Sequence, residues 1–114
     1  MSKMGIELKI HPDIKKTIDE HKDQIISFCN KNNIKKISLF GSALRDDFDD
    51  ESDIDILVWF EPQHKPGFFE LVRMEEDLSS ILEGREVDLR TPKDLSRYFR
   101  DEILGRSEEI YAQR

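Results

Sequence analysis

Apolar residues recur along the chain with two different spacings, and these spacings predict its elements. Over residues 13–30 they return every three to four positions, the period of a helix with one buried side. The members of this stripe are Ile14, Ile18, Ile25, Phe28 and Cys29. Pro12 suits the entrance of such a helix, and the polar run 30–33 suits its exit. We therefore expect a single helix over 13–30.

Denser apolar runs, rich in β-branched residues, predict strands. They cover residues 34–40 and 53–60, and a shorter run covers 86–90. The second run is apolar on both faces beyond its first residues, so we expect it to be central in a covered sheet. Residues 109–112 predict a small edge strand near the end of the chain.

Helical spacing returns after the second predicted strand. Residues 68–82 place Phe68, Leu71, Met74, Leu78 and Ile81 on one side, and Gly84 suits the C-terminal cap. A last helical stretch is expected over 95–104, and a short helix after Gly41, capped by Ser42, over 43–45. The alternation of helices and strands predicts an α/β (α+β) fold, a mixed β-sheet flanked by helices, formed by one domain of residues 1–114.

Composition narrows the class of protein. The chain has 114 residues, of which 37% are hydrophobic and 38% charged, which is enough for one modest core. No apolar run approaches the roughly 20 residues that span a bilayer, and the first five residues lack a signal-peptide pattern. A single cysteine, Cys29, excludes an internal disulfide. We expect a cytoplasmic protein with no membrane segment.

The net charge of the chain indicates which kinds of macromolecule it can bind. The formal net charge is −7. Binding to nucleic acid without sequence preference needs Lys and Arg to neutralise phosphates, so direct nucleic-acid binding is not expected. An acidic domain more readily meets a basic protein.

Two aspartates at the head of the second predicted strand are the first candidate for chemistry. Asp53 and Asp55 are two residues apart, so on a strand both project from the same face. Asp55 already lies within the apolar run, and adjacent carboxylates are costly to desolvate without a counter-charge. Mg²⁺, a hard cation that takes oxygen ligands, is the natural counter-charge. The alternative is an exposed strand entrance with solvated carboxylates.

Gly41 and Ser42 end the first predicted strand and suit a phosphate. Glycine lets the backbone approach an anion closely, and a following helix N-terminus directs free N–H groups at it. The Ser42 hydroxyl can add a donor, and Arg45 could reach a phosphate oxygen. An ordinary turn and a surface arginine are the alternatives.

Asp88 is a third carboxylate, flanked by Val87 and Leu89 in the short third strand. A strand–helix–strand crossover can return it beside Asp53 and Asp55. Three carboxylates that meet would hold two Mg²⁺ ions roughly 3.5–4 Å apart, the arrangement used for in-line displacement at phosphorus. Asp88 would then be near enough to take a proton from the attacking hydroxyl. The alternative is an exposed position on an edge strand.

At these residues the sequence resembles the DNA polymerase β-like nucleotidyltransferase superfamily. The superfamily signature is Gly-Ser, ten residues, Asp-x-Asp, and a further Asp on a later strand. Here it reads Gly41-Ser42, ALRDDFDDES, Asp53-Ile54-Asp55 and later Asp88. The resemblance implies the palm-like nucleotidyltransferase fold. It also implies that Asp53, Asp55 and Asp88 are the catalytic, metal-binding residues and that Gly41 and Ser42 hold the triphosphate of ATP.

Within that superfamily the chain is similar to the minimal nucleotidyltransferases encoded beside a HEPN-domain protein. This resemblance implies an antitoxin that transfers AMP from ATP to a tyrosine of its HEPN ribonuclease toxin, with two Mg²⁺ ions. Larger relatives carry a further domain that clasps the base and the acceptor, and its lack here favours a protein acceptor. Two alternatives stay open: an antitoxin that acts by binding and occlusion without catalysis, and nucleotidyl transfer to a small molecule such as an aminoglycoside.

Overall fold

The computed structural model describes residues 10–45, 47–49 and 51–113. The first nine residues, on which the expectation about a signal peptide depends, lie outside this range, as do residues 46 and 50 of the acidic stretch before Asp53. Among the helices of the described residues, none has the length and apolar character needed to cross a membrane.

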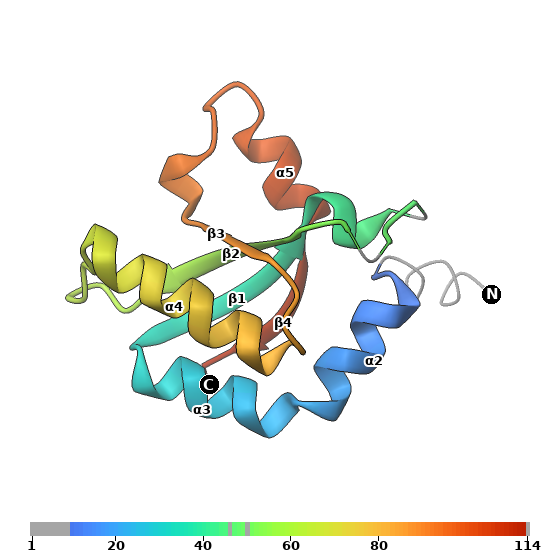
Figure 1. Ribbon diagram of the computed structural model, residues 1–114. Coiled ribbons are helices and arrows are strands. Elements are labelled where there is room, and N and C mark those ends of the chain that lie inside the picture. Colours follow the sequence, from blue (N-terminus) through green and yellow to red (C-terminus); the bar gives the residue numbers. More distant parts are fainter. Residues whose placement is uncertain (1–9, 46, 50, 114) are drawn as a thin grey trace.

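Four strands form one mixed sheet, as predicted (Figure 1). They are β1 (Ile34–Phe40), β2 (Ile54–Phe60), β3 (Val87–Arg90) and β4 (Glu108–Ala112), in the spatial order β3-β2-β1-β4. β1 runs antiparallel to both β2 and β4, whereas β2 and β3 are parallel. The predictions of an internal second strand and of a C-terminal edge strand are confirmed.

Helices lie on both sides of this sheet (Figure 1). α2 (Pro12–Glu20), α3 (Lys22–Lys31) and α4 (Phe68–Ile81) bury their apolar sides in one core with alternate residues of β1 and β2. α5 (Arg100–Arg106) lies on the opposite side. Cys29 is fully buried in the core, and burial raises the pKa of its thiol to about 12, so it is a poor nucleophile.

The single helix expected over 13–30 is wrong, because the chain leaves the helical conformation at His21. Its backbone has φ −116° and ψ 24°, and it separates α2 from α3. Its ring is held by Gln24 and by Glu83 beyond the end of α4. The apolar stripe continues across the break, which is why the pattern did not reveal it.

The expected helix over 95–104 begins later than predicted, at Arg100. The Arg100 guanidinium donates to the carbonyl oxygens of Lys93 and Leu95, at 3.4 and 3.1 Å. A side chain therefore takes the Leu95 carbonyl that a helix would pair with a backbone N–H, and residues 95–99 stay outside the helix. The short turn η2 (Pro92–Asp94) precedes this segment.

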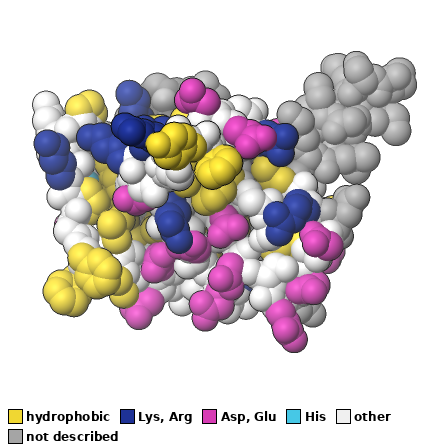
Figure 2. Space-filling view, turned by 90° about the horizontal axis from the view of Figure 1, so that it is seen from above, with side chains coloured by type: hydrophobic (Ala, Val, Ile, Leu, Met, Phe, Trp, Pro, Cys, Tyr) yellow, Lys and Arg dark blue, Asp and Glu magenta, His cyan; other side chains and the backbone are white. Residues whose placement is uncertain are grey.

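Phe68 is not part of the core, contrary to the prediction. It is 72% exposed and its neighbour Phe69 is 83% exposed, because both belong to the first turn of α4, ahead of the buried Met74 and Leu78. Figure 2 shows hydrophobic side chains in separate groups at the surface, with charged side chains between them.

Candidate active site

Asp55 and Asp88 are neighbours across the parallel strands β2 and β3. Their Cα atoms are register partners, so both side chains project from the same face of the sheet. Ile54 and Ile56, on either side of Asp55, face the core that is shared with α2, α3 and α4. The carboxylates therefore lie on the other face, the side of α5. The structure brings these two predicted residues together.

Gly41 is fitted closely against the Asp55 carboxylate. Its φ is +68°, a conformation that favours glycine, and a Cβ built on it would clash with Asp55 Oδ2. The backbone N–H of Ser42 donates to the same carboxylate. The strand end at Gly41 thus has a structural role: it lets Asp55 reach the backbone of the first strand.

A short helix follows β1 as predicted, but the prediction that Ser42 is its N-cap is wrong, because the N-cap is Phe40. Residues Gly41–Leu44 form a single 3₁₀ turn, η1, that begins directly after Phe40. The Ser42 hydroxyl donates to the carbonyl oxygen of Asp53 at 2.8 Å. It therefore joins the end of β1 to the residue before β2, and both of its polar groups already have partners in the protein.

The electrostatic environment of Asp55 disfavours its charge. Burial raises the pKa of this carboxyl above its ordinary value, and the neighbouring charges of Asp88 and Asp53 raise it further. The Ser42 N–H and the Arg90 charge act in the opposite direction and are outweighed. An added cation would relieve this cost, since it favours the charged form.

Asp53 is exposed and lies at the entrance of β2. The loop before it is folded by hydrogen bonds, including two from Arg85 Nη2 to the carbonyl oxygens of Asp49 and Ser52, at 2.6 and 3.2 Å. Arg85 also lies over the buried Phe48 ring, 4.7 Å from its centroid. These contacts fix where the chain enters β2, and hence where Asp53 lies.

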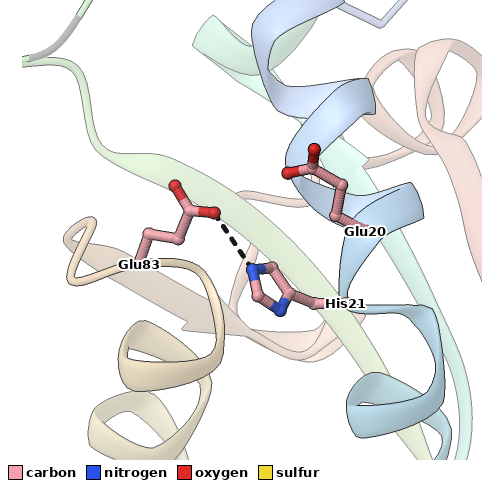
Figure 3. Close-up of side chains that lie close together, drawn as sticks. All are labelled: Glu20, His21 and Glu83. Atoms are coloured by element: carbon pink, nitrogen blue, oxygen red, sulfur yellow. Dashed lines mark hydrogen bonds and ion pairs between the residues drawn. The ribbon is translucent and has the colours of Figure 1, made fainter.

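Asp88 is paired within the protein. Arg90, two residues along β3, donates through Nε to both carboxylate oxygens at 3.3 Å and through Nη2 to Oδ2 at 3.2 Å. Among the described residues, one group of three acidic or histidine side chains has ligand atoms that all lie within 4.8 Å of one another, and it does not include the three aspartates. That group is Glu20, His21 and Glu83 (Figure 3).

The Glu20–His21–Glu83 group is explained by hydrogen bonding. His21 Nε2 is 3.0 Å from Glu83 Oε2, and Nδ1 is 2.7 Å from Gln24 Oε1. The bond to Glu83, followed by the bond to Gln24, raises the pKa of His21. Both ring nitrogens face oxygen atoms, which suits a protonated imidazole that links the α2–α3 break to the end of α4.

The residues around Asp55 fit a magnesium ion by their chemistry. Carboxylate oxygens are the ligands that this hard cation prefers. Asp55 and Asp88 are register partners on β2 and β3, and the charge of Asp53 also acts on Asp55. The repulsion among them is the physical cost that a divalent cation would remove.

Arg45, predicted to reach a phosphate, is exposed and pairs with Asp47 at 3.4 Å. It lines a cavity of about 510 Å³ together with residues of η1 and α5. The cavity residues of α5, among them Ile103 and Arg106, were not predicted from the sequence. They are about 60 positions from Gly41, and no local pattern marks them.

Comparison with known proteins decides the family. The family model described as "Polymerase beta, Nucleotidyltransferase" matches residues 23–114. The chain belongs to this family. The match runs from α3 through the last strand and includes Gly41, Asp55 and Asp88, so the nucleotidyltransferase fold predicted from the motif is confirmed.

Relatives of this nucleotidyltransferase carry related names. A protein of Methanocaldococcus jannaschii, "Putative protein adenylyltransferase MJ0435", is 36% identical over 93 residues, which cover 82% of this chain and 97% of the relative. A solved structure named "Structure of putative minimal nucleotidyltransferase" has a TM-score of 0.66 and 26% identity, and the match covers 89% of this chain and 97% of that one. A second, "Crystal structure of the toxin-antitoxin with AMP-PNP", has a TM-score of 0.64 and 22% identity over 81% of this chain and 73% of that one. At 22% identity, the likeness to this second structure shows the fold alone.

Proposed function

We propose that this nucleotidyltransferase moves AMP from ATP to a tyrosine of a HEPN ribonuclease toxin and thereby acts as its antitoxin. One observation carries the proposal. Asp55 is held against Gly41, beside Asp88 on the neighbouring strand, at the positions of the nucleotidyltransferase signature. Membership of the family supports nucleotidyl transfer as the reaction. The tyrosine acceptor is our inference.

The reaction exchanges one bond to phosphorus for another. The phenol oxygen of the acceptor tyrosine attacks the α-phosphorus of ATP and forms a P–O bond. The bond between the α-phosphorus and the bridging oxygen to the β-phosphorus breaks, and pyrophosphate leaves with that electron pair. The phenol proton passes to a base at the site. The product is a tyrosine with AMP on its oxygen.

Each predicted residue has a part in this reaction. Asp53, Asp55 and Asp88 would hold two Mg²⁺ ions, which supply positive charge to the triphosphate and lower the pKa of the attacking hydroxyl. Asp88 would accept the phenol proton once its carboxylate is released from Arg90. Gly41 and Ser42 would face the phosphates, and Arg45 would leave Asp47 to contact a phosphate oxygen.

A protein acceptor is supported by two independent points. The Methanocaldococcus relative, whose match covers most of both chains, carries the name of a protein adenylyltransferase. The net charge of −7 suits association with a basic protein and not with a polyanion. A toxin as the partner is suggested by the toxin–antitoxin structure that shares this fold and was solved with an ATP analogue.

The test is transfer of label from ATP carrying ³²P at the α-phosphate. The purified chain is incubated with Mg²⁺ and with the HEPN toxin proposed as its partner. We expect label on the partner, its loss with Asp55→Asn, and full labelling with Asp23→Asn, a matched change at an exposed aspartate of α3. Absence of label on the partner, combined with neutralisation by Asp53→Asn/Asp55→Asn without nucleotide, would replace transfer by occlusion. Label on an aminoglycoside instead would move the acceptor to a small molecule.

A further inference from the structure

The chain has two tyrosines, and they differ in how accessible they are. Tyr98 lies in the turn before α5 and is 81% exposed. Tyr111, in β4, is partly buried against the core, and its hydroxyl donates to Asn30 Oδ1 at 3.3 Å. The proposed function makes a tyrosine phenol the acceptor of AMP. Tyr98 is therefore a candidate acceptor within the chain itself.

The turn that carries Tyr98 is held in a defined conformation. Leu95 is buried at its start, and the Arg100 guanidinium donates to the Leu95 carbonyl oxygen at 3.1 Å. Ser96 accepts two backbone N–H groups, that of Phe99 at its carbonyl oxygen and that of Tyr98 at its hydroxyl. In Figure 1 this segment is the orange loop at the top of the view, on the side of the sheet where α5 lies. Because the turn is already ordered, little conformational entropy is lost when another protein binds it.

The surroundings of Tyr98 are basic, although the chain as a whole is acidic. The segment 93–100 contains three basic residues and one acidic residue, whereas the net charge of the chain is −7. The Arg97 guanidinium lies over the Tyr98 ring, 5.7 Å from its centroid. An exposed tyrosine in a basic surface is the kind of acceptor that suits an acidic transferase. Tyr98 thus has the charge environment expected of a substrate tyrosine.

The edge of the candidate active site has the opposite charge. Four carboxylates are exposed in the loop that leads into β2 and at its entrance: Asp47, Asp49, Glu51 and Asp53. Arg45 pairs with Asp47 and offsets one of these charges. The acidic edge of one copy therefore attracts the basic segment 93–100 of another copy. This charge complementarity favours an encounter in which Tyr98 of one copy approaches the aspartates of the other.

We propose that the chain transfers AMP from ATP to Tyr98 of a second copy of itself. The phenol oxygen of Tyr98 attacks the α-phosphorus of the ATP held by the other copy and forms a P–O bond. The bond from that phosphorus to the oxygen that bridges to the β-phosphorus breaks, and pyrophosphate leaves with the electron pair. The phenol proton passes to a base at the site. This inference rests on the proposed function for its reaction, and it adds a second acceptor.

The test separates the acceptor from the enzyme by mixing two variants. Asp55→Asn keeps Tyr98 and is expected to lack transfer activity, whereas Tyr98→Phe keeps the aspartates and lacks the phenol oxygen. The two carry different purification tags and are incubated with Mg²⁺ and ATP labelled with ³²P at the α-phosphate. We expect label on the Asp55→Asn copy, at Tyr98 by peptide mapping, and no label on either variant incubated alone.

Matched acceptors carry a second change in the Asp55→Asn background. Adding Tyr98→Phe, which removes one exposed hydroxyl, should abolish labelling of the acceptor. Adding Tyr111→Phe should leave it unchanged. Absence of label on the Asp55→Asn copy would overturn self-transfer, and so would label that persists when Tyr98→Phe is added.

Failure of the proposed function gives a different result. Tyr98→Phe should still label the HEPN toxin as wild type does, because Tyr98 has no part in that transfer. Label on the toxin with none on Tyr98 would overturn the self-transfer alone. Label on Tyr98 with none on the toxin would support self-transfer and would remove the toxin as the acceptor.

Discussion

At the scale of residues, the site depends on a close fit between one glycine and one carboxylate. Gly41 has a positive φ, and there is no room for a side chain between it and Asp55. Sequence alone predicted both residues, because Gly-Ser and Asp-x-Asp form a recognisable signature. It did not predict their contact, because the contact depends on the register of β1 and β2.

Replacing Gly41 tests this fit. Gly41→Ser should lower the free energy of unfolding by about 1–2 kcal/mol, the cost of a left-handed conformation for a residue with a Cβ. It should also remove transfer activity, because the new Cβ displaces the Asp55 carboxylate. Thermal unfolding and the labelling assay measure the two effects. Gly67→Ser, at an open N-cap with φ −81°, should leave both unchanged, and equal behaviour of the two variants would contradict this role.

Asp55 should reduce stability when it is ionised. Its pKa is raised in the folded chain, so the folded state holds the proton more tightly than the unfolded state does. The protonated Asp55 carboxyl therefore contributes to the free energy of unfolding. This contribution is fully present below the ordinary pKa of 3.8 and is lost as the pH rises through the raised value. Without Mg²⁺, Asp55→Asn should therefore gain stability relative to wild type between acid and neutral pH.

Denaturant unfolding of both proteins at a series of pH values measures this difference. Asp47→Asn serves as the control, because Asp47 is exposed and makes only a surface pair with Arg45. If the difference in free energy of unfolding between Asp55→Asn and wild type became smaller toward neutral pH, the raised pKa of Asp55 would be contradicted.

At the scale of elements, periodicity predicted the kind of element better than its ends. The four strands appear where apolar runs predicted them, because these runs are long enough to be recognised. The breaks at His21 and before Arg100 were not predicted, since both depend on side chains that bond to distant groups: His21 to Glu83, and Arg100 to the Lys93 carbonyl. The exposure of Phe68 likewise depends on where α4 meets the sheet.

The His21 link between α3 and α4 should depend on pH. Glu83, Gln24 and Glu20 are the groups that raise the pKa of His21, so the imidazolium is favoured in the folded chain. The stability that it supplies is complete below its ordinary pKa of 6.5 and is lost as the pH rises through the raised value. Glu83→Gln should therefore unfold at a lower temperature than wild type at pH 6, and the two melting temperatures should converge by pH 9. A gap that persists unchanged at pH 9 would show that the link is not ionic.

At the scale of the whole molecule, the fold links four segments that are separate in the sequence. η1 lies against Asp55 of β2, β2 pairs with β3, and α5 lines a cavity together with η1, although these segments are spread over residues 41–106. The motif reveals the first three, because aspartates within apolar runs are unusual. α5 carries no such mark, and only the tertiary structure shows that Ile103 and Arg106 line the cavity beside Phe40.

The central claim is that Asp53, Asp55 and Asp88 bind the divalent cations. The most direct measurement is a crystal structure with Mn²⁺ and a non-hydrolysable ATP analogue, since Mn²⁺ takes the same oxygen ligands and its anomalous scattering locates it. We predict Mn²⁺ in contact with Asp53, Asp55 and Asp88, with the triphosphate at Gly41. Mn²⁺ bound at Glu20, His21 and Glu83 instead, with Asp88 still paired to Arg90, would contradict the account.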